Sequence, residues 1–325
     1  WDRKTTDMLL QVPITFTNGD AAAPAINIGG VTNTGYDLIV GYADRKGDFG
    51  YSFSANISGY TNVVDALDNP DSRIYGYGSR VPSMTVTQQG EEISSFYGFK
   101  VLGIFQSQSE ADAWAPYGTY NSPGKFKIED TNSDGQINDS DRGIIGSPHP
   151  DYTYGINLNL DYKNWSLNVF GNGSQGNELF NYVRFFADFN SFQGNRSTRA
   201  LRDAWQPSNP AAPKSSWTAA NPNATSPIMD ANDQTSSRVS TYLIEDGSYF
   251  RIKNIQLTYN FDDTINSLLG IAGGQVYLQA QNMITITDYS GLNPEIQTGA
   301  DTTIGFDGGY MPVSKTVLVG LNINL

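Results

Sequence analysis

The chain has 325 residues, with 20 Lys and Arg against 33 Asp and Glu, which gives a net charge of −13. This acidic balance argues against a nucleic-acid-binding protein, and the lack of any cysteine excludes disulfides and thiolate chemistry. Its 33 glycines, 19 tyrosines and low charged content of 16% indicate strands joined by Gly and Asn turns. No apolar run is long enough for a membrane helix, and residues 1–4 do not open a signal peptide. Either the protein is intracellular, or the chain does not begin where its gene product begins.

Alternating apolar and polar residues predict eight β-strands. In the segment DYTYGINLNLDY, Tyr154, Ile156 and Leu158 fall on one face, while Asn157 and Asn159 fall on the other. This follows because successive side chains point to opposite faces of a strand. The predicted strands cover residues 2–12, 32–44, 49–61, 150–162, 165–175, 248–261, 274–286 and 314–325.

Two architectures share this strand pattern. In a soluble β-sandwich the apolar faces form the core, whereas in an outer-membrane barrel they meet lipid and the polar faces line the lumen. The strands are long enough for a tilted membrane span, and tyrosines and tryptophans lie near their ends. Connections also alternate between short ones (44–48, 163–164, 262–273) and long ones (62–149, 176–247, 287–313). We therefore predict an all-β fold, an antiparallel transmembrane β-barrel segment with long extracellular loops.

The segment DTNSDGQINDSD, residues 130–141, has the spacing of a calcium-binding loop. Positions 1, 3, 5, 7, 9 and 12 are held by Asp130, Asn132, Asp134, Gln136, Asn138 and Asp141. Gly135 occupies the sharp turn at position 6, and Ile137 is expected to point inward. Asp141 stands where such loops usually carry a longer Glu. The oxygen-rich set predicts bound Ca²⁺; the alternative is an Asx-rich turn closed by its own hydrogen bonds.

Other polar and aromatic residues give weaker signals. His149, between two prolines, is predicted to be a turn residue, and the pairs 91–92 and 245–246 are predicted to be solvated charges. Since no acid–base pair stands out, we expect no enzyme. The aromatic residues of the long loops are expected to pack those loops or to stack on sugar rings; they are Trp114, Tyr117, Phe185, Phe186, Trp205 and Trp217. Residues 177–189 are compatible with a short helix or a strand.

Several segments resemble the C-terminal part of the SusC/RagA family of TonB-dependent outer-membrane transporters of Bacteroidota. The most specific is GKFKIEDTNSDGQINDSDRGIIGSPHPDYTYGINLNLDYKNWSLNVFGNGSQGNELFNY, and others are WDRKTTDMLLQVPI, YLIEDGSYFRIKNIQLTYNF and VLVGLNINL. The resemblance implies a barrel of about 22 strands with an N-terminal plug. It also implies a SusD-like lipoprotein lid, and import of glycan or peptide oligomers driven through TonB. The final Leu325 departs from the Phe that usually ends such barrels.

The resemblance further implies that residues 1–325 are the C-terminal portion of a larger barrel, lacking the plug and fourteen strands. The C-terminus would be periplasmic. We expect the strands at 2–12 and 314–325 to pair with strands outside this chain, because an open edge in lipid leaves backbone groups unsatisfied. Residues 62–149 and 176–247 are expected to form the outer face and to contact the lid. The alternative function is that of a soluble or surface-attached, calcium-containing β-sandwich that binds carbohydrate.

Overall fold

The computed structural model describes residues 1–325 except 12–24, 79, 190–193 and 297–299. Its main element is an eight-stranded antiparallel sheet with the strand order β1-β2-β3-β10-β11-β14-β15-β17. The strands are β1 (Asp2–Gln11), β2 (Ala25–Lys46), β3 (Phe49–Ala66), β10 (Tyr152–Tyr162), β11 (Trp165–Gln175), β14 (Tyr249–Asn260), β15 (Gly273–Thr287) and β17 (Thr316–Asn324). All eight predicted strands are present, with β2 and β3 extended to 22 and 18 residues.

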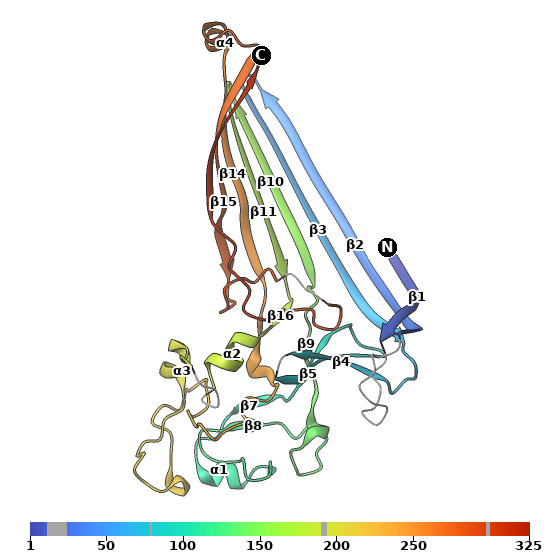
Figure 1. The fold of residues 1–325 in the computed structure, drawn as a ribbon, viewed down its shortest axis with the longest axis vertical. Coiled ribbons are helices and arrows are strands. Elements are labelled where there is room, and N and C mark those ends of the chain that lie inside the picture. The colour runs from blue at the N-terminus through green and yellow to red at the C-terminus, as the bar shows by residue number, and fades with distance from the viewer. Residues whose placement is uncertain (12–24, 79, 190–193, 297–299) are drawn as a thin grey trace.

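Short connections lie at one end of the sheet and long ones at the other (Figure 1). The β2–β3 turn needs only Gly47 and Asp48, so it is tighter than the predicted 44–48 loop. The predicted turn at 163–164 is confirmed, with Lys163 at a positive φ of 53°. The third connection contains α4 (Asp263–Leu269), which Asp262 caps and Gly270 ends with a φ of 66°. These turns keep neighbouring strands in register.

One face of the sheet is apolar and remains uncovered by other described elements. Paired residues form rows across the strands; one row is Tyr42, Phe53, Leu158, Val169, Ile255, Ala280 and Val317. Val319 on the same face of β17 is 76% exposed, and Ile156 is 37% exposed. Tyr154 and Leu158 are half-buried, and the ring of Tyr154 stacks on that of Phe250 with centroids 5.9 Å apart. A sandwich would bury this face in a core, so the sandwich alternative is wrong for the described residues.

Aromatic residues collect on the apolar face near the short turns. Tyr162 of β10 pairs with Phe49 of β3 and with Trp165 of β11. Trp165 in turn pairs with Tyr259 of β14, and their ring centroids are 4.8 Å apart. This arrangement is the aromatic girdle expected where the surface of a barrel meets the bilayer interface.

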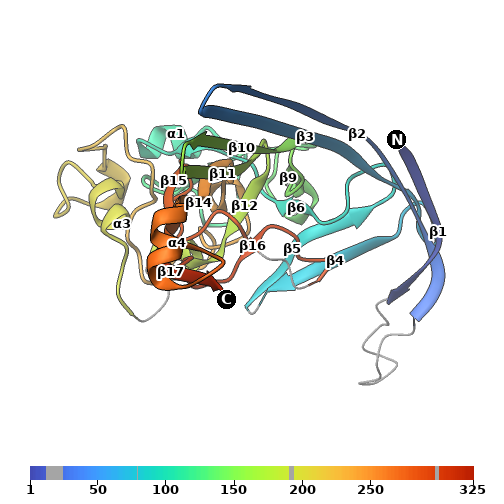
Figure 2. The same ribbon diagram turned by 90° about the horizontal axis from the view of Figure 1, so that it is seen from above.

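The opposite face is polar and meets the loops. The sheet curves around loop segments, as Figure 2 shows. On this face the backbone N–H of Ile93, from a loop, donates to Oδ1 of Asn62 on β3 at 3.0 Å. The concave side of the wall is therefore the polar side.

The long connections fold into a unit of their own, below the sheet in Figure 1. Its strands are β4 (Arg73–Gly78), β5 (Val81–Gln88), β6 (Ser95–Gly98), β7 (Val101–Ile104), β8 (Phe126–Ile128), β9 (Gly143–Gly146), β12 (Glu178–Asn181), β13 (Ile244–Asp246) and β16 (Phe306–Asp307). Its α-helices are α1 (Gln108–Asp112), α2 (Tyr182–Ala187) and α3 (Thr198–Asp203). Residues 177–189 thus contain both a strand and a helix. Among the helices of the described residues, none has the length and apolar character needed to cross a membrane.

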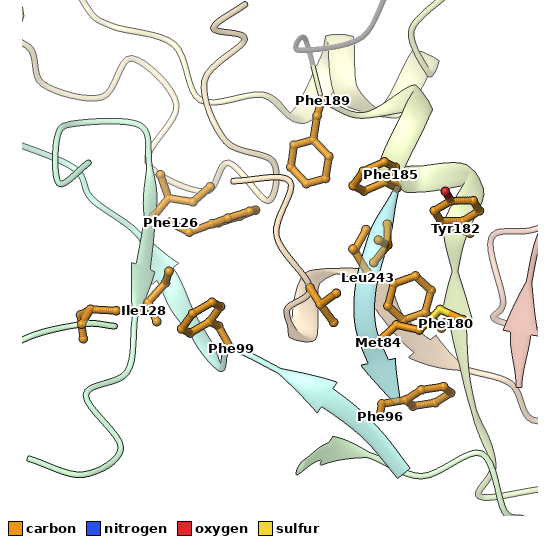
Figure 3. Packing of buried hydrophobic residues seen from close by; sticks show 14 of the residues in the cluster. Met84, Phe96, Phe99, Phe126, Ile128, Phe180, Tyr182, Phe185, Phe189 and Leu243 are labelled. Atoms are coloured by element: carbon orange, nitrogen blue, oxygen red, sulfur yellow. The ribbon is translucent and has the colours of Figure 1, made fainter. Parts of the chain in front are cut away.

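The largest cluster of buried apolar residues lies in this loop unit rather than in the sheet. Phenylalanines 96, 99, 126, 180, 185 and 189 pack with Met84, Ile128, Tyr182 and Leu243 (Figure 3). Trp205 is fully buried and Trp217 packs against it with centroids 6.3 Å apart. For Phe185 and Trp205 the expectation of loop packing is confirmed, since both side chains are inside the core.

Candidate functional site

The first half of the 130–141 loop is held by Asx hydrogen bonds. The carboxylate of Asp130 accepts the backbone N–H groups of Asp134 at 3.2 Å and Gly135 at 2.9 Å. Oδ1 of Asn132 accepts the N–H of Asp134 at 2.9 Å, and Oδ1 of Asp134 accepts the N–H of Gln136 at 2.8 Å. Gly135 has a φ of 81°, a left-handed conformation that glycine adopts without steric cost. Position 6 is therefore the sharp turn that the spacing predicts.

The second half closes on Asp141, whose side chain is only 2% exposed. Its Oδ1 accepts the N–H of Thr131 at 2.9 Å, and its Oδ2 accepts the N–H of Asn138 at 2.8 Å. Asn138 reciprocates by accepting the N–H of Ser140 at 2.8 Å, which forms a capping box around the 3-10 turn Asp139–Asp141. The short Asp thus ties the two ends of the loop together.

The loop is anchored in the core of the loop unit. Ile137 is buried, as predicted, and its N–H donates to the carbonyl of Pro116 at 2.9 Å. Arg238 forms an ion pair with Asp139, and the guanidinium of Arg142 donates to the carbonyl of Ser83 at 2.7 Å. These contacts join the loop to segments that are distant in sequence, so the loop also has a structural role.

The donor set of the loop consists of oxygens, which suits a hard cation such as Ca²⁺. Within the described part of the chain, no group of three or more His, Cys, Asp or Glu side chains is placed to hold a metal ion. Amide and carbonyl oxygens of Asn132 and Gln136 would therefore have to complete the ligand set. Oδ1 of Asp141 accepts both the N–H of Thr131 and, at 3.4 Å, its hydroxyl, whereas Oδ2 accepts the N–H of Asn138 and keeps a second lone-pair position for a cation.

A ladder of polar side chains crosses the concave face of the sheet. Nδ2 of Asn159 donates to Ser52 at 3.1 Å, and Nδ2 of Asn168 donates to Asn159 at 2.7 Å. The ladder continues from Asn254 to Asn168 at 3.0 Å and from Gln279 to Asn254 at 2.7 Å. It joins β3, β10, β11, β14 and β15 without any formal charge. The concave face therefore presents neutral amide and hydroxyl groups that are hydrogen-bonded to one another.

The weaker sequence candidates have structural partners. Nε2 of His149 lies 2.8 Å from the carbonyl oxygen of Ile93, and Nδ1 lies 3.2 Å from the hydroxyl of Tyr60. Because a carbonyl can only accept, Nε2 carries the proton. His149 thus ties a loop to β3, which agrees with its predicted structural role.

Glu245, predicted to be a solvated charge, is instead paired. Its carboxylate lies 3.1 Å from the Arg184 guanidinium and accepts from Asn181 at 2.8 Å and Ser290 at 2.9 Å. Burial raises the pKa of this carboxyl, but Arg184 and the hydrogen bonds outweigh burial and hold the pKa below its ordinary value. The prediction of solvation was wrong for Glu245, because its ion-pair partner is 61 residues away in the chain.

A second charged cluster was not found from the sequence. Arg251 and Lys253 of β14 share the carboxylate of Glu295, which lies in the connection between β15 and β17. Regular alternation would put both cations on the apolar face of Ile255 and Leu257. The register of β14 shifts between Ile252 and Asn254, and this β-bulge at Lys253 places them on the polar face instead, which the sequence pattern does not predict. Their partner comes from a loop more than 40 residues later, where no periodic pattern exists.

Comparisons with known proteins agree with this fold. A scan against models of protein families finds no match. TonB-dependent receptor P3 of Formosa agariphila is 31% identical over 330 residues, which cover 98% of this chain and 31% of the receptor. TonB-dependent receptor SusC of Bacteroides thetaiotaomicron is 28% identical over 330 residues, covering 99% of this chain and 29% of SusC. The chain thus spans less than a third of the length of these two relatives.

Solved structures show the same architecture. The RagAB peptide transporter matches with a TM-score of 0.75 and 22% identity, covering 99% of this chain and 32% of the matched chain. Its closed-closed state matches with a TM-score of 0.73 at 23% identity, over 99% of this chain and 32% of that one. The transmembrane barrel fold and the resemblance drawn from the sequence are thus confirmed.

Proposed function

Because the chain resembles SusC/RagA-family TonB-dependent receptors over nearly its whole length, we propose that it forms part of the barrel wall of an outer-membrane nutrient importer. The main support is that the sheet has one uncovered apolar face and one concave face crossed by a hydrogen-bonded ladder of amide side chains. An apolar band facing lipid and a polar interior characterise transmembrane barrels. Imported solutes would be glycan or peptide oligomers, and the chain itself would catalyse no reaction.

The open edges of the sheet support a larger barrel. Among the described strands, β1 and β17 are at opposite ends of the sheet and do not pair with each other. Residues 25–34 of β2 pair with β1, whereas the opposite end of β2 pairs only with β3. Each unsatisfied backbone group in lipid costs several kcal/mol. We propose that further strands of the same receptor cover both edges, and that its plug and TonB-interacting part also lie outside this chain.

A SusD-like lipoprotein is the proposed partner of the loop unit, with the short turns and the C-terminus in the periplasm. The exposed tip at residues 208–216 projects from a segment fixed by the buried Trp205 and by Trp217.

Replacing residues 209–215 of the intact receptor with a Gly-Ser linker should weaken copurification of the lipoprotein. Barrel assembly should be unchanged, because the replacement spares both tryptophans. A matched control replaces residues 264–268 of α4, at the opposite end of the sheet, and should leave copurification intact. Equal lipoprotein recovery from both variants would contradict this partner surface.

We further propose that the 130–141 loop binds Ca²⁺ through the six predicted residues: Asp130, Asn132, Asp134, Gln136, Asn138 and Asp141. Support comes from the left-handed Gly135 and the Asx turns, which give the backbone the form of such loops. Ca²⁺ at 100 times its dissociation constant should stabilise the loop unit by about 2.7 kcal/mol. Thermal unfolding with Ca²⁺ and with a chelator measures this difference.

Asp130→Asn should abolish the calcium-dependent part of the unfolding shift, since it removes a ligand charge but keeps the acceptor oxygen for Gly135. Asp112→Asn, an exposed carboxylate outside the loop, is the matched control and should keep the full shift. An identical melting temperature with and without Ca²⁺ in the unmutated receptor would show that the loop is an empty Asx turn.

A further inference from the structure

The clearest unassigned site lies on the polar face of β14. Two cationic side chains converge there on a single carboxylate, and Lys253 contacts both of its oxygens. Nη1 of Arg251 and Nζ of Lys253 are each 2.6 Å from Oε2 of Glu295. Among the described residues, neither cation forms another ion pair. Two positive charges therefore face one negative charge, and the cluster keeps a net charge of +1.

The cationic side of the cluster is built into the wall. Arg251 is 3% exposed, its Nε donates to Oγ1 of Thr285 at 2.9 Å, and its Nη2 donates to Oδ1 of Asn293 at 2.7 Å. Thr285 is in β15, so this bond holds Arg251 within the wall, whereas the Nη1 and Nη2 acceptors Glu295 and Asn293 both belong to the loop. A guanidinium fork beside an ammonium matches the geometry of carboxylate, sulfate and phosphate groups.

The anionic side belongs to a loop and is more accessible. The side chains of Glu295 and Lys253 are 32% and 28% exposed. Residues 288–296, here called the strap, are held at one end where the hydroxyl of Ser290 donates to Glu245 at 2.9 Å. At the other end Asn293 and Glu295 hold the strap to the wall. Between these anchors Leu292 is 67% exposed.

We propose that Arg251 and Lys253 form an oxyanion site whose resident ligand is Glu295, and that an anionic group on a solute in the lumen displaces this carboxylate and frees the strap. The proposal rests on the proposed function, since it needs the concave face to line the solute path. Glu295 can leave because it is carried by a loop, whereas Arg251 cannot follow it out of the wall. The ligand class is an oligomer bearing carboxylate, sulfate or phosphate groups. Binding of the oligomer and attachment of the strap then compete, which couples them.

A spin label on the strap tests the exchange directly. This chain has no cysteine, so Leu292→Cys carries a single label in an intact receptor whose cysteines outside this chain are replaced by serine. The probes are inorganic sulfate, a uronic-acid oligosaccharide, and sodium chloride at matched ionic strength. We expect the oligosaccharide and sulfate to raise label mobility and chloride to leave it unchanged. The Glu295→Gln variant should show a mobile label without any anion, and should bind the oligosaccharide about tenfold more tightly.

Glu91→Gln, the same change at an exposed carboxylate, serves as the control and should behave like the unmutated receptor. If sulfate and chloride raised label mobility equally, ionic screening alone would explain the release of the strap, and the oxyanion site would be overturned. Release by sulfate but not by the oligosaccharide would overturn the solute assignment. If the Glu295→Gln variant does not assemble, the change in label mobility of the receptor with native Glu295, titrated with each anion, tests the proposal by itself. The label reports on the strap without transport, so a failed transport assay together with anion release would count against the importer and not against the site.

Discussion

At the scale of single residues, Glu245 makes the stability of the loop unit depend on pH. It joins α2 through Arg184 to the start of the strap through Ser290, so one carboxylate holds two loops together. Arg184 and the hydrogen bonds keep its pKa below the ordinary value although burial acts in the opposite direction. A carboxyl whose folded pKa is depressed stabilises the fold above its unfolded pKa, and this contribution disappears as the pH falls through the folded pKa.

The loop unit should therefore lose stability as the pH falls below the ordinary glutamate pKa of about 4.3. Glu245→Gln should cost about 2 kcal/mol at pH 7, the value typical of hydrogen bonds to a charged group. It should also flatten the acid side of the stability curve. Thermal unfolding between neutral and acidic pH, with Glu91→Gln as control, measures both effects. An acid limb of equal slope in the Glu245→Gln variant would contradict the assignment.

Residue-scale prediction from the sequence succeeded where the interaction is local. The spacing around Gly135 placed the left-handed turn, and the apolar Ile137 was expected inside, where it is buried. It failed for Glu245 and did not find Glu295, because their partners lie in segments that only the tertiary fold brings together. A two-residue alternation predicts which way a strand residue points, but it contains no information about a loop that returns to the strand.

At the scale of elements, the strands were predictable because each half-covered strand must alternate polar and apolar residues. The observed bounds of β10 and β11 differ from the prediction by two residues or fewer at each end. At the loop end of the sheet the prediction began β2 seven residues too late and ended β3 five residues too early. Beyond the expected membrane span these strands continue as a ribbon whose pattern is less regular. The short strand β12 and the helix α2 follow each other directly, so neither had a sequence long enough to show its period.

At the scale of the whole molecule, stability is divided between two parts of different character. The loop unit has the larger apolar core and the ion pairs of Asp188 and Lys125. The sheet is a single curved layer whose outward face lacks a covering layer among the described residues, so its apolar face needs lipid. Contiguous exposed apolar rows of this kind mark a surface that contacts membrane or another protein.

The central claim is that the apolar face of this wall meets lipid and the polar face meets the lumen. Single cysteines at positions 156, 157, 158 and 159 of β10 test it in a receptor whose cysteines outside this chain, which itself has none, are replaced by serine. In the intact receptor in membranes, an aqueous maleimide should modify Asn157→Cys and Asn159→Cys, while fluorophores on Ile156→Cys and Leu158→Cys should be quenched by brominated lipid. Reactivity to maleimide at all four positions, or quenching at the two asparagine positions, would contradict the account.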